Sequence, residues 1–556
     1  MEDGKITPEY FRTDPGIFMV KKYLFFNRFT IFSREDSTIH HQPARVACQA
    51  VNENPENGAN IATKSGEQAP MKPKLTLLHD DLIEQIILEA YTVLGTLGVE
   101  IRNDVVRSRL VDHGAAIDRA SSRVRITRNM IDTAIRTAPS SFRLYSPSGE
   151  EKADFSGDRI HFTPGSTAIN ILDHATGSMR TPVTADYVAF SKIISGLDNI
   201  VLNSTALIPS DVHELVSDSY RLYLSLIYCD KPLVTGAFTS EAFEIMRDLQ
   251  LVLRGTVKSL EEKPMAVFSC CPTSPLKWSD VTSQNLVDCA ESMIPVEFIA
   301  MPLSGFMAPV SLVGTLIQHT AETLSGIVIS QMSRPGAPML YGGSPAIFDV
   351  RYETTPMGAI ETMMIDCAYC EIGKHLGLPT QAYISFSDSK LLDAQAGLES
   401  GMGAVMAALA GINSISGPGM LDFESCQSLE KLVLDNEICG MALRLSRGIE
   451  AREDFPSLPR FRELLADKHL LISPHTRKYL KEEFYLPGPV IDRARRNRWI
   501  QDGGLSINER AHREVERLQR DYVRPAMSGD ARRDLKMLMD AWAKRHGMER
   551  LPEIDL

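Results

Sequence analysis

The sequence has few features of membrane, secreted or nucleic-acid-binding proteins. It contains no run of 18 or more uncharged apolar residues, so we predict no membrane-spanning segment. The net charge of −12 argues against a nucleic-acid-binding protein, which usually carries a basic face. The nine cysteines are scattered and odd in number, which favours reduced thiols in a cytoplasmic protein over a disulfide framework.

Motifs of several catalytic classes are also missing. No GxGxxG or Walker A pattern follows a predicted strand, and the GMG at 401–403 falls inside a predicted helix, where packing is its more common role. There is no GxSxG nucleophile elbow. Two loop serines, Ser344 and Ser416, are better placed to bind backbone or ligand than to attack a substrate.

Zinc ligands are scarce in the sequence. Cys367 and Cys370 form an isolated CxxC in the middle of a predicted helix, and no HxH or HExxH pair accompanies them. Cys270 and Cys271 close a predicted strand and could contribute a thiolate ligand. Structural zinc requires four such ligands and catalytic zinc three, so we expect no metal centre.

The chain of 556 residues is long enough for one large domain with additions or for two to three domains. Residues 1–70 include a polar stretch rich in Asn, Gly and Glu and are predicted to be a disordered extension, and a start of translation at Met71 is an open alternative. Helical periodicity predicts a helical cap over 71–155 and a charged helical extension over 451–556. The basic segment near 491–500 reads as the solvated face of a helix.

Residues 156–450 alternate short apolar runs with longer amphipathic segments. Eight such strand–helix units predict a closed (β/α)₈ barrel, an α/β fold, in preference to an open doubly wound sheet. Five of the predicted strands begin at a proline, which the first position of a strand tolerates. The predicted strands are 167–172, 200–205, 232–237, 264–270, 295–301, 338–342, 379–385 and 411–416. The predicted helices are 185–195, 214–229, 240–253, 279–293, 310–333, 356–376, 389–409 and 428–447.

Charged residues cluster in the loops that follow the sixth and seventh predicted strands. In such barrels the chemistry lies on the loops after the strands. Asp349 and Arg351 are two residues apart, so in an extended loop their side chains face the same side. The arginine could then grip a carboxylate with two parallel hydrogen bonds, and a structural ion pair between the loop and a helix is an equal alternative. Asp388 is either a site residue or part of the cap of the following helix.

Long motifs in the second half of the barrel resemble the trimethylamine methyltransferase superfamily. They are MPLSGFMAPVSLVGTLIQHTAETLSGIVISQ, YGGSPAIFDVR, TTPMGAIE, GLPTQAYISFSDSKLLDAQAG and GINSISGPGMLDFE, joined by HTRKYLKEEFYLPGPVIDRARRNRW near the C-terminus. The resemblance implies a (β/α)₈ barrel that moves a methyl group from a methylated amine to the Co(I) of a separate corrinoid protein. The corrinoid would belong to the partner, so we expect no tightly bound cofactor on this chain, and we expect a homo-oligomer.

The founding members of that superfamily use pyrrolysine, whereas this chain contains only standard residues. It therefore resembles the branch that includes glycine betaine methyltransferases. A quaternary ammonium already carries the positive charge that makes the amine a good leaving group. The expected substrate is thus a quaternary amine such as a betaine, carnitine or choline.

A quaternary ammonium ion favours carboxylates and aromatic faces. Aromatic residues near the strand ends, including Tyr352, are candidates for such a cage, with core packing as the alternative. The predicted substrate-binding residues are Tyr341, Phe348, Asp349, Arg351, Glu361, Phe386, Asp388, Lys390, Asp393, Gln395 and Ser416. Two other functions stay open: zinc-dependent methyl transfer from another donor, and non-catalytic binding of a ligand or a corrinoid protein.

Overall fold

Eight short parallel strands form a closed barrel in this computed structural model, which describes residues 72–118 and 120–554. The described residues belong to the compact unit Gln68–Leu556. The predictions for 1–70, including a start at Met71, lie outside them. The barrel strands are β6 (His161–Thr163), β9 (Asn203–Ser204), β10 (Leu233–Thr235), β11 (Ala266–Cys270), β13 (Val296–Phe298), β15 (Met339–Leu340), β17 (Gln381–Tyr383) and β18 (Ser414–Ser416).

Two parallel sheets join edge to edge to close the barrel. One has the order β15–β13–β11–β10–β9 and the other β17–β18–β6. A parallel bridge between Tyr341 and Thr380 links β15 to β17. The backbone N–H of Leu202 donates to the carbonyl of Phe162 at 3.3 Å and links β9 to β6. The predicted (β/α)₈ barrel is therefore confirmed.

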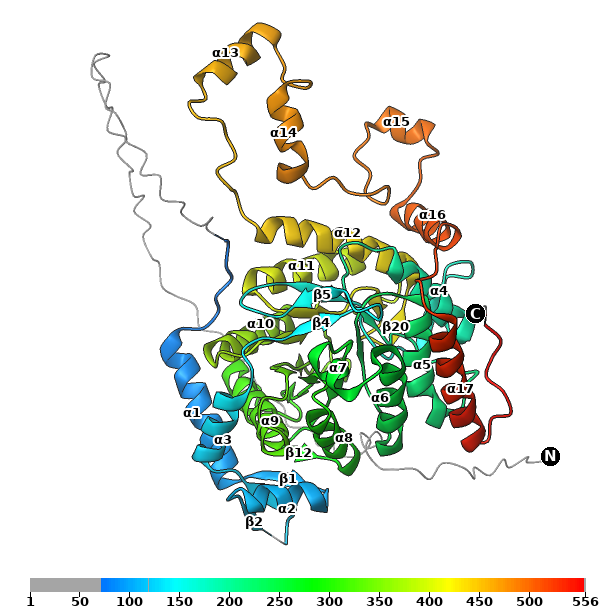
Figure 1. Ribbon diagram of the computed structural model, residues 1–556. Coiled ribbons are helices and arrows are strands. Elements are labelled where there is room, and N and C mark those ends of the chain that lie inside the picture. Colours follow the sequence, from blue (N-terminus) through cyan, green and yellow to red (C-terminus); the bar gives the residue numbers. More distant parts are fainter. Residues whose placement is uncertain (1–71, 119, 555–556) are drawn as a thin grey trace, which may run out of the picture. The chain divides into compact units, whose positions relative to one another are not determined.

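An outer layer of helices covers the barrel (Figure 1). Each of the eight predicted helices is present within a few residues of its predicted bounds. They are α4 (Thr184–Ser195), α5 (Glu214–Tyr228), α6 (Ser240–Arg254), α8 (Asp280–Glu291), α9 (Leu312–Ser333), α10 (Ile360–His375), α11 (Ala394–Ala410) and α12 (Leu429–Ser446), with the short α7 (Val257–Glu262) after α6. Side chains of Thr239, Ser279, Ser311, Asp393 and Ser428 accept a backbone N–H at the starts of α6, α8, α9, α11 and α12.

The prediction of 167–172 as the first strand of the barrel is wrong. The first barrel strand is β6, and the chain turns outward after it at Thr167, whose φ is +66°. Strand β7 (Asn170–Asp173) instead joins β8 (Ser178–Arg180), β20 (Cys426–Gln427) and β19 (Met420–Leu421) in a separate sheet. Two short apolar runs lie close together here, and hydrophobic periodicity alone cannot tell which of them enters the barrel.

The segment predicted as a helical cap is only partly helical. It contains α1 (Asp80–Thr96), α2 (Asp104–Asp112) and α3 (Arg128–Thr137). It also contains a small sheet of β1 (Val99–Ile101), β3 (Arg123–Arg125) and β2 (Ala116–Asp118), which β12 (Lys277–Trp278) extends from the barrel. Helices α1 and α3 pack against α9, the longest barrel helix.

A hairpin of β4 (Arg143–Tyr145) and β5 (Glu151–Asp154) covers the N-terminal end of the barrel. Its residues Leu144, Ala153 and Phe155 form a buried cluster with residues of the barrel strands, among them Val234 and Val267. The Tyr145 N–H donates to the carbonyl of Pro264 at the start of the β11 segment. The barrel is thus sealed at this end, and only the opposite end is free to hold a site.

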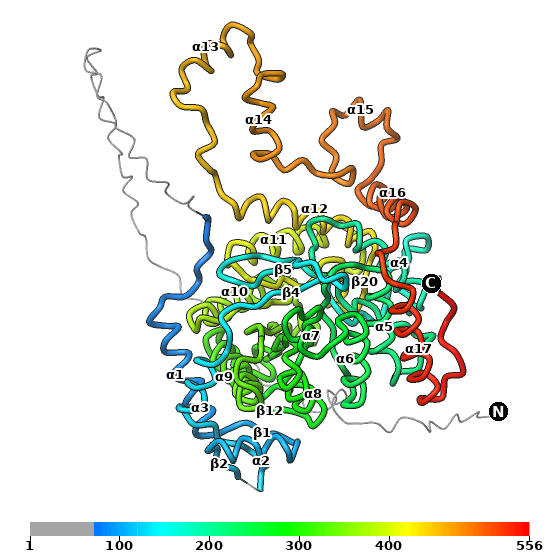
Figure 2. Tube along the Cα trace, in the orientation of Figure 1, coloured from blue at the N-terminus to red at the C-terminus, as the bar shows by residue number. Residues whose placement is uncertain are grey.

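The C-terminal part contains α13 (Leu458–Asp467), α14 (Pro474–Glu483), α15 (Arg496–Gln501), α16 (Ile507–Arg520) and α17 (Gly529–Arg545). Helix α16 packs on α12 and α4, and α17 packs on α5 and α6, as the red end of the trace shows in Figure 2. Within the described residues, no helix is long and apolar enough to cross a membrane.

A buried ion pair anchors the loop after β18. Lys431 and Asp435, both fully buried on α12, pair with each other, and Lys431 Nζ also donates to Ser400 Oγ at 2.7 Å. Asp435 accepts the Gly419 N–H at 2.7 Å, which ties the loop to the helix. Removing one partner of such a pair leaves an uncompensated buried charge.

We expect Lys431→Met to lower the free energy of unfolding by about 3–5 kcal/mol in urea unfolding. The matched control is Lys536→Met, which breaks an exposed i, i+4 pair with Asp540 on α17. Its expected loss is at most about 0.5 kcal/mol. Equal losses in the two variants would contradict an anchoring role for Lys431.

Candidate functional site

A cavity of about 370 Å³ lies where the barrel strands end. It has the size of a small-molecule site and the position that active sites take in this fold. Its walls come from segments that follow several different strands, including Ser166, Phe238, Cys271, Met301, Tyr383 and Glu424. Three larger hollows, of about 470, 810 and 1010 Å³, lie against α17 or α16 and contain no barrel-strand end.

Glu297 on β13 lies in the barrel beside this cavity and is fully buried. Its Oε1 accepts hydrogen bonds from Ser269 Oγ at 2.7 Å and from the Tyr383 hydroxyl at 3.3 Å, and both partners line the cavity. The Tyr383 hydroxyl also lies 3.2 Å from Ser166 Oγ. Burial raises the pKa of Glu297 to about 7, against the hydrogen bonds that lower it.

A second carboxylate, that of Glu424, enters the cavity from the turn between β19 and β20. Burial raises its pKa to about 8, and the negative charge of Glu297 adds to the rise. Asp422, Phe423 and Glu424 have φ values of +50°, +55° and +67°, so three successive non-glycine residues adopt a left-handed backbone. Such strain persists only where the surrounding structure holds it, and it concentrates at functional sites.

The loop after β10 carries Phe238, which also lines the cavity. A buried ion pair between Arg221 and Asp218 holds this loop. Asp218 accepts the Phe238 N–H at 2.6 Å, and the Arg221 guanidinium lies 5.3 Å from the centre of the Phe238 ring. The ring is therefore positioned by groups that are themselves fixed inside the protein.

The cavity has an acidic and aromatic lining. Among the described residues that line it, none is a lysine, arginine or histidine. Two carboxylates with raised pKa values lie in or beside it, together with the rings of Phe238 and Tyr383. Perturbed carboxylates in a cleft are typical of functional sites. A cation that enters would lower both pKa values and favour the ionised carboxylates.

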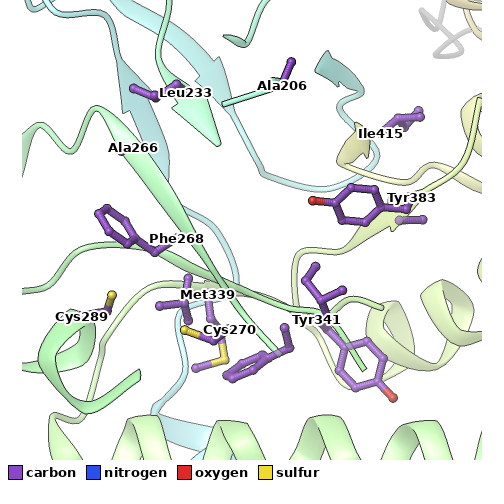
Figure 3. Packing of buried hydrophobic residues seen from close by; sticks show 14 of the residues in the cluster. Ala206, Leu233, Ala266, Phe268, Cys270, Cys289, Met339, Tyr341, Tyr383 and Ile415 are labelled. Atoms are coloured by element: carbon purple, nitrogen blue, oxygen red, sulfur yellow. The ribbon is translucent and has the colours of Figure 1, made fainter. Parts of the chain in front are cut away.

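The predicted residues after β15 lie outside the cavity lining. Asp349 and Arg351 form an ion pair at 2.6 Å, with the arginine side chain 77% exposed, and this pair lowers the pKa of Asp349 to about 2. Phe348 stacks on Phe306 with ring centres 4.8 Å apart. Tyr341 points toward the helices, away from the direction of Tyr383, and donates to Thr320 Oγ1 (Figure 3).

The predicted residues after β17 mainly support the loops. Asp388 accepts the N–H groups of Met357 and Gly358 at 3.1 and 2.8 Å, and burial raises its pKa to about 6. Asp393 caps α11, and Gln395 donates to Glu399.

Lys390 lies closest to the acidic turn. Its Nζ is 4.0 Å from the centre of the Phe423 ring and 3.5 Å from Asp422, so it contacts the turn that presents Glu424. Phe386 and Ser416 are buried, and Glu361 is exposed in the first turn of α10. None of the eleven predicted residues lines the cavity, and their role in substrate binding stays a prediction.

The sequence analysis did not find Glu297, Tyr383, Phe238 or Glu424. A signal existed for Glu297, because it is a lone charged residue inside the apolar strand segment PVEFIA. No comparable signal marks Phe238 or Glu424, whose loops meet only in the folded chain. Two lining residues, Ser344 and Cys271, were noted for their chemistry but not chosen.

Comparison with known proteins identifies the family of the chain. The family model described as trimethylamine methyltransferase (MTTB) matches residues 50–547, so the chain belongs to that family, and it is a methyltransferase. A glycine betaine methyltransferase from Desulfitobacterium hafniense is 29% identical over 86% of this chain and 99% of its own length. A trimethylamine methyltransferase from Methanosarcina barkeri is 29% identical over 84% of this chain and 95% of its own length. The monomethylamine methyltransferase structure from M. barkeri aligns over 81% of this chain and 89% of its own, at 12% identity and a TM-score of 0.48.

The raised pKa values predict a pH-dependent stability. The folded-state pKa of Glu297 and Glu424 lies above their ordinary value of 4.5. Their contribution to stability is therefore complete below about pH 4.5 and is lost as the pH rises through 7 and 8. Between about pH 4.5 and the folded-state pKa values of about 7 and 8 we expect the free energy of unfolding to fall by up to about 1.4 kcal/mol per pH unit for each of the two groups, and to level off above them.

Urea unfolding at a series of pH values tests this with Glu297→Gln. The variant should show a shallower decline than the wild type, because it lacks one ionisation. Glu553→Gln removes the charge of a side chain that is 94% exposed, and the stability of this variant should decline like that of the wild type. Parallel declines of Glu297→Gln and the wild type would show that Glu297 does not titrate in this range.

Proposed function

We propose that this protein transfers a methyl group from a quaternary amine, such as glycine betaine, to the Co(I) of a separate corrinoid protein. The observation that carries the proposal is the cavity at the strand ends, which Glu424 lines and Glu297 adjoins, with no basic side chain among its described lining residues. Membership of the family supports the reaction class. Free thiols at all cysteines of the described part support a reducing compartment, the cytoplasm.

The lining suits a quaternary ammonium ion. Such an ion has no N–H to donate, so it is held by opposite charge and by aromatic faces. Glu424 and Glu297 supply the charge, and Phe238 and Tyr383 supply the rings. Ile299 and Met301 add apolar contact for the methyl groups, and the charged substrate favours the ionised carboxylates.

This chain contributes to the reaction mainly by holding the substrate in one position and orientation. When the partner is bound, its corrinoid supplies Co(I) as the methyl acceptor. The C–N bond breaks with its electron pair going to nitrogen, so the amine leaves neutral and needs no proton donor. The residues of the cavity hold the cation in one orientation and keep water away, and orientation alone can contribute roughly 7–11 kcal/mol.

An apolar rim beside the cavity supports docking of the corrinoid protein there. The rim lies on the loops after β13 and β15, where β14 (Leu303–Ser304) pairs with β16 (Ala346–Ile347). Its exposed residues are Met301, Phe306, Met307, Val310, Val350 and Tyr352. Met301 also lines the cavity, so the rim and the cavity adjoin. A cluster of exposed apolar side chains is typical of a protein–protein contact.

The first experiment is methyl transfer to reduced cobalamin, followed by its visible spectrum. We expect transfer from one of glycine betaine, carnitine and choline, and none from trimethylamine, whose nitrogen carries no permanent charge. Transfer from trimethylamine alone would overturn the substrate class. Saturable binding without transfer, when a competent partner is present, would favour non-catalytic binding, and activity that requires zinc in the assay would favour the zinc-dependent alternative.

Glu424→Gln tests the role of the charge in the cavity. The substitution keeps the shape of the side chain and removes its charge, so we expect kcat/KM for the quaternary amine to fall about 10- to 100-fold. In the wild type the KM should decrease as the pH rises through 7 and 8, because both carboxylates become ionised. In Glu424→Gln, the decrease of the KM near pH 8 should be absent, because the carboxylate that ionises there has been removed. An unchanged kcat/KM would exclude Glu424 from cation binding, with Glu553→Gln as the control.

The carboxylate clamp at Arg351 has a separate test. If Arg351 leaves Asp349 to bind a substrate carboxylate, Arg351→Ala should raise the KM for glycine betaine by about tenfold or more and change that for choline little. Arg495→Ala, at another exposed arginine, is the control. Equal effects of Arg351→Ala on the two substrates would remove the clamp hypothesis.

A further inference from the structure

Two histidines and a buried glutamate converge at a second place, away from the cavity lining. His174 follows β7, Glu430 lies in the first turn of α12, and His512 lies on α16. One ligand atom from each lies within 4.8 Å of the others. The Nδ1 atoms of His512 and His174 are 2.9 and 3.7 Å from the same oxygen, Oε1 of Glu430. None of the three lines the cavity at the strand ends.

The two imidazole rings lie face to face. Their centres are 3.6 Å apart and their planes differ by 7°. The Nδ1 atoms of both rings lie near the same carboxylate oxygen. The side chains of His174 and His512 are 27% and 34% exposed, which leaves an approach from solvent. An ion could therefore reach this point and keep a coordination position for water.

The carboxylate of Glu430 lacks a permanent positive partner in the described ion pairs. Its side chain is 6% exposed, and its ion pairs among the described residues are those with the two histidines. Its other oxygen lies 3.4 Å from Ser428 Oγ. A buried carboxylate is costly unless a cation or strong hydrogen bonds compensate it, and neutral imidazoles supply no net charge.

We propose that His174, Glu430 and His512 bind a divalent transition-metal ion, zinc by preference, with water in the fourth position. Two imidazole nitrogens and one carboxylate oxygen form a ligand set that zinc accepts. A second carboxylate faces the other side of one ligand, because Glu516 Oε1 lies 3.7 Å from Nε2 of His512. A carboxylate beside the free nitrogen of a metal-bound histidine orients the ring and strengthens the ligand.

The fold explains why the three ligands meet. Strands β7 and β20 pair in parallel, with Asn170 opposite Cys426, so the segments that follow them leave the sheet side by side. Those segments carry His174 and Glu430, and α16 packs on α12 to bring His512. The ion would tie helix α16 of the C-terminal part to the sheet whose β19–β20 turn presents Glu424 to the cavity. The site is thus a structural link, separate from the methyl-transfer chemistry.

The expectation of no metal centre rested on the lack of closely spaced ligand pairs. These ligands are separated by 256 and 82 positions in the sequence, from 174 to 430 and from 430 to 512. No spacing motif covers such distances, so the sequence analysis had no means of finding them.

Metal titration of the full chain tests the proposal. After treatment with a chelator and dialysis, Zn²⁺ and Co²⁺ should each bind at about one ion per chain in calorimetry. The Co²⁺ complex should show visible d–d absorption. Mg²⁺ should not compete, because it prefers oxygen ligands. Bound zinc should also raise the melting temperature, a readout independent of enzyme activity.

Variants give the decisive comparison. We expect His174→Ala, His512→Ala and Glu430→Gln each to weaken Zn²⁺ binding by more than about 10-fold, since even outer partners of metal ligands contribute that much. His469→Ala, at an exposed histidine of the C-terminal part, should bind like the wild type. Circular dichroism identifies any variant that fails to fold, and the other two then carry the comparison. Absence of stoichiometric Zn²⁺ binding, or binding equal in wild type and folded variants, would overturn the proposal.

Discussion

Closure of eight very short parallel strands is the constraint on which the rest of this structure depends. Strands of two to five residues leave little room for error in register, and each is buried on both faces by the barrel interior and by the helices. The β4–β5 hairpin seals the N-terminal end with apolar side chains. Polar side chains can therefore line an open site only at the opposite end, where the strands end, and the cavity lies there.

The carboxylates near that cavity are held in place by hydrogen bonds and by a neighbouring buried ion pair. Glu297 keeps hydrogen bonds from Ser269 and Tyr383, and its raised pKa reflects the cost of ionising it inside the barrel. Lys431 and Asp435 fix the loop that leads toward Glu424. The left-handed backbone of residues 422–424 is a further local cost that this support offsets.

The sheet β19–β20–β7–β8 connects the two sites. One of its turns presents Glu424 to the cavity, and the segments after β7 and β20 bring His174 and Glu430 together. Helix α16 closes this second cluster with His512. A part of the chain that lies outside the barrel thus helps to define the geometry at its mouth.

The sequence by itself determined the barrel, the bounds of its eight helices within a few residues, and the family. Helical periodicity and long motifs are local properties, so they survive without the fold. It did not determine the first strand, because two apolar runs compete between residues 159 and 172 and only pairing with β18 and β9 selects β6.

The residues of the cavity were decided by tertiary structure. The loops after β15 and β17 carry many charges, and this density directed the prediction to Asp349, Arg351 and Asp388. The fold uses those side chains in a loop ion pair and in loop support. Glu297 and Glu424 approach each other across 127 positions because all strands of a closed barrel end at one side of it, and no local pattern encodes that approach.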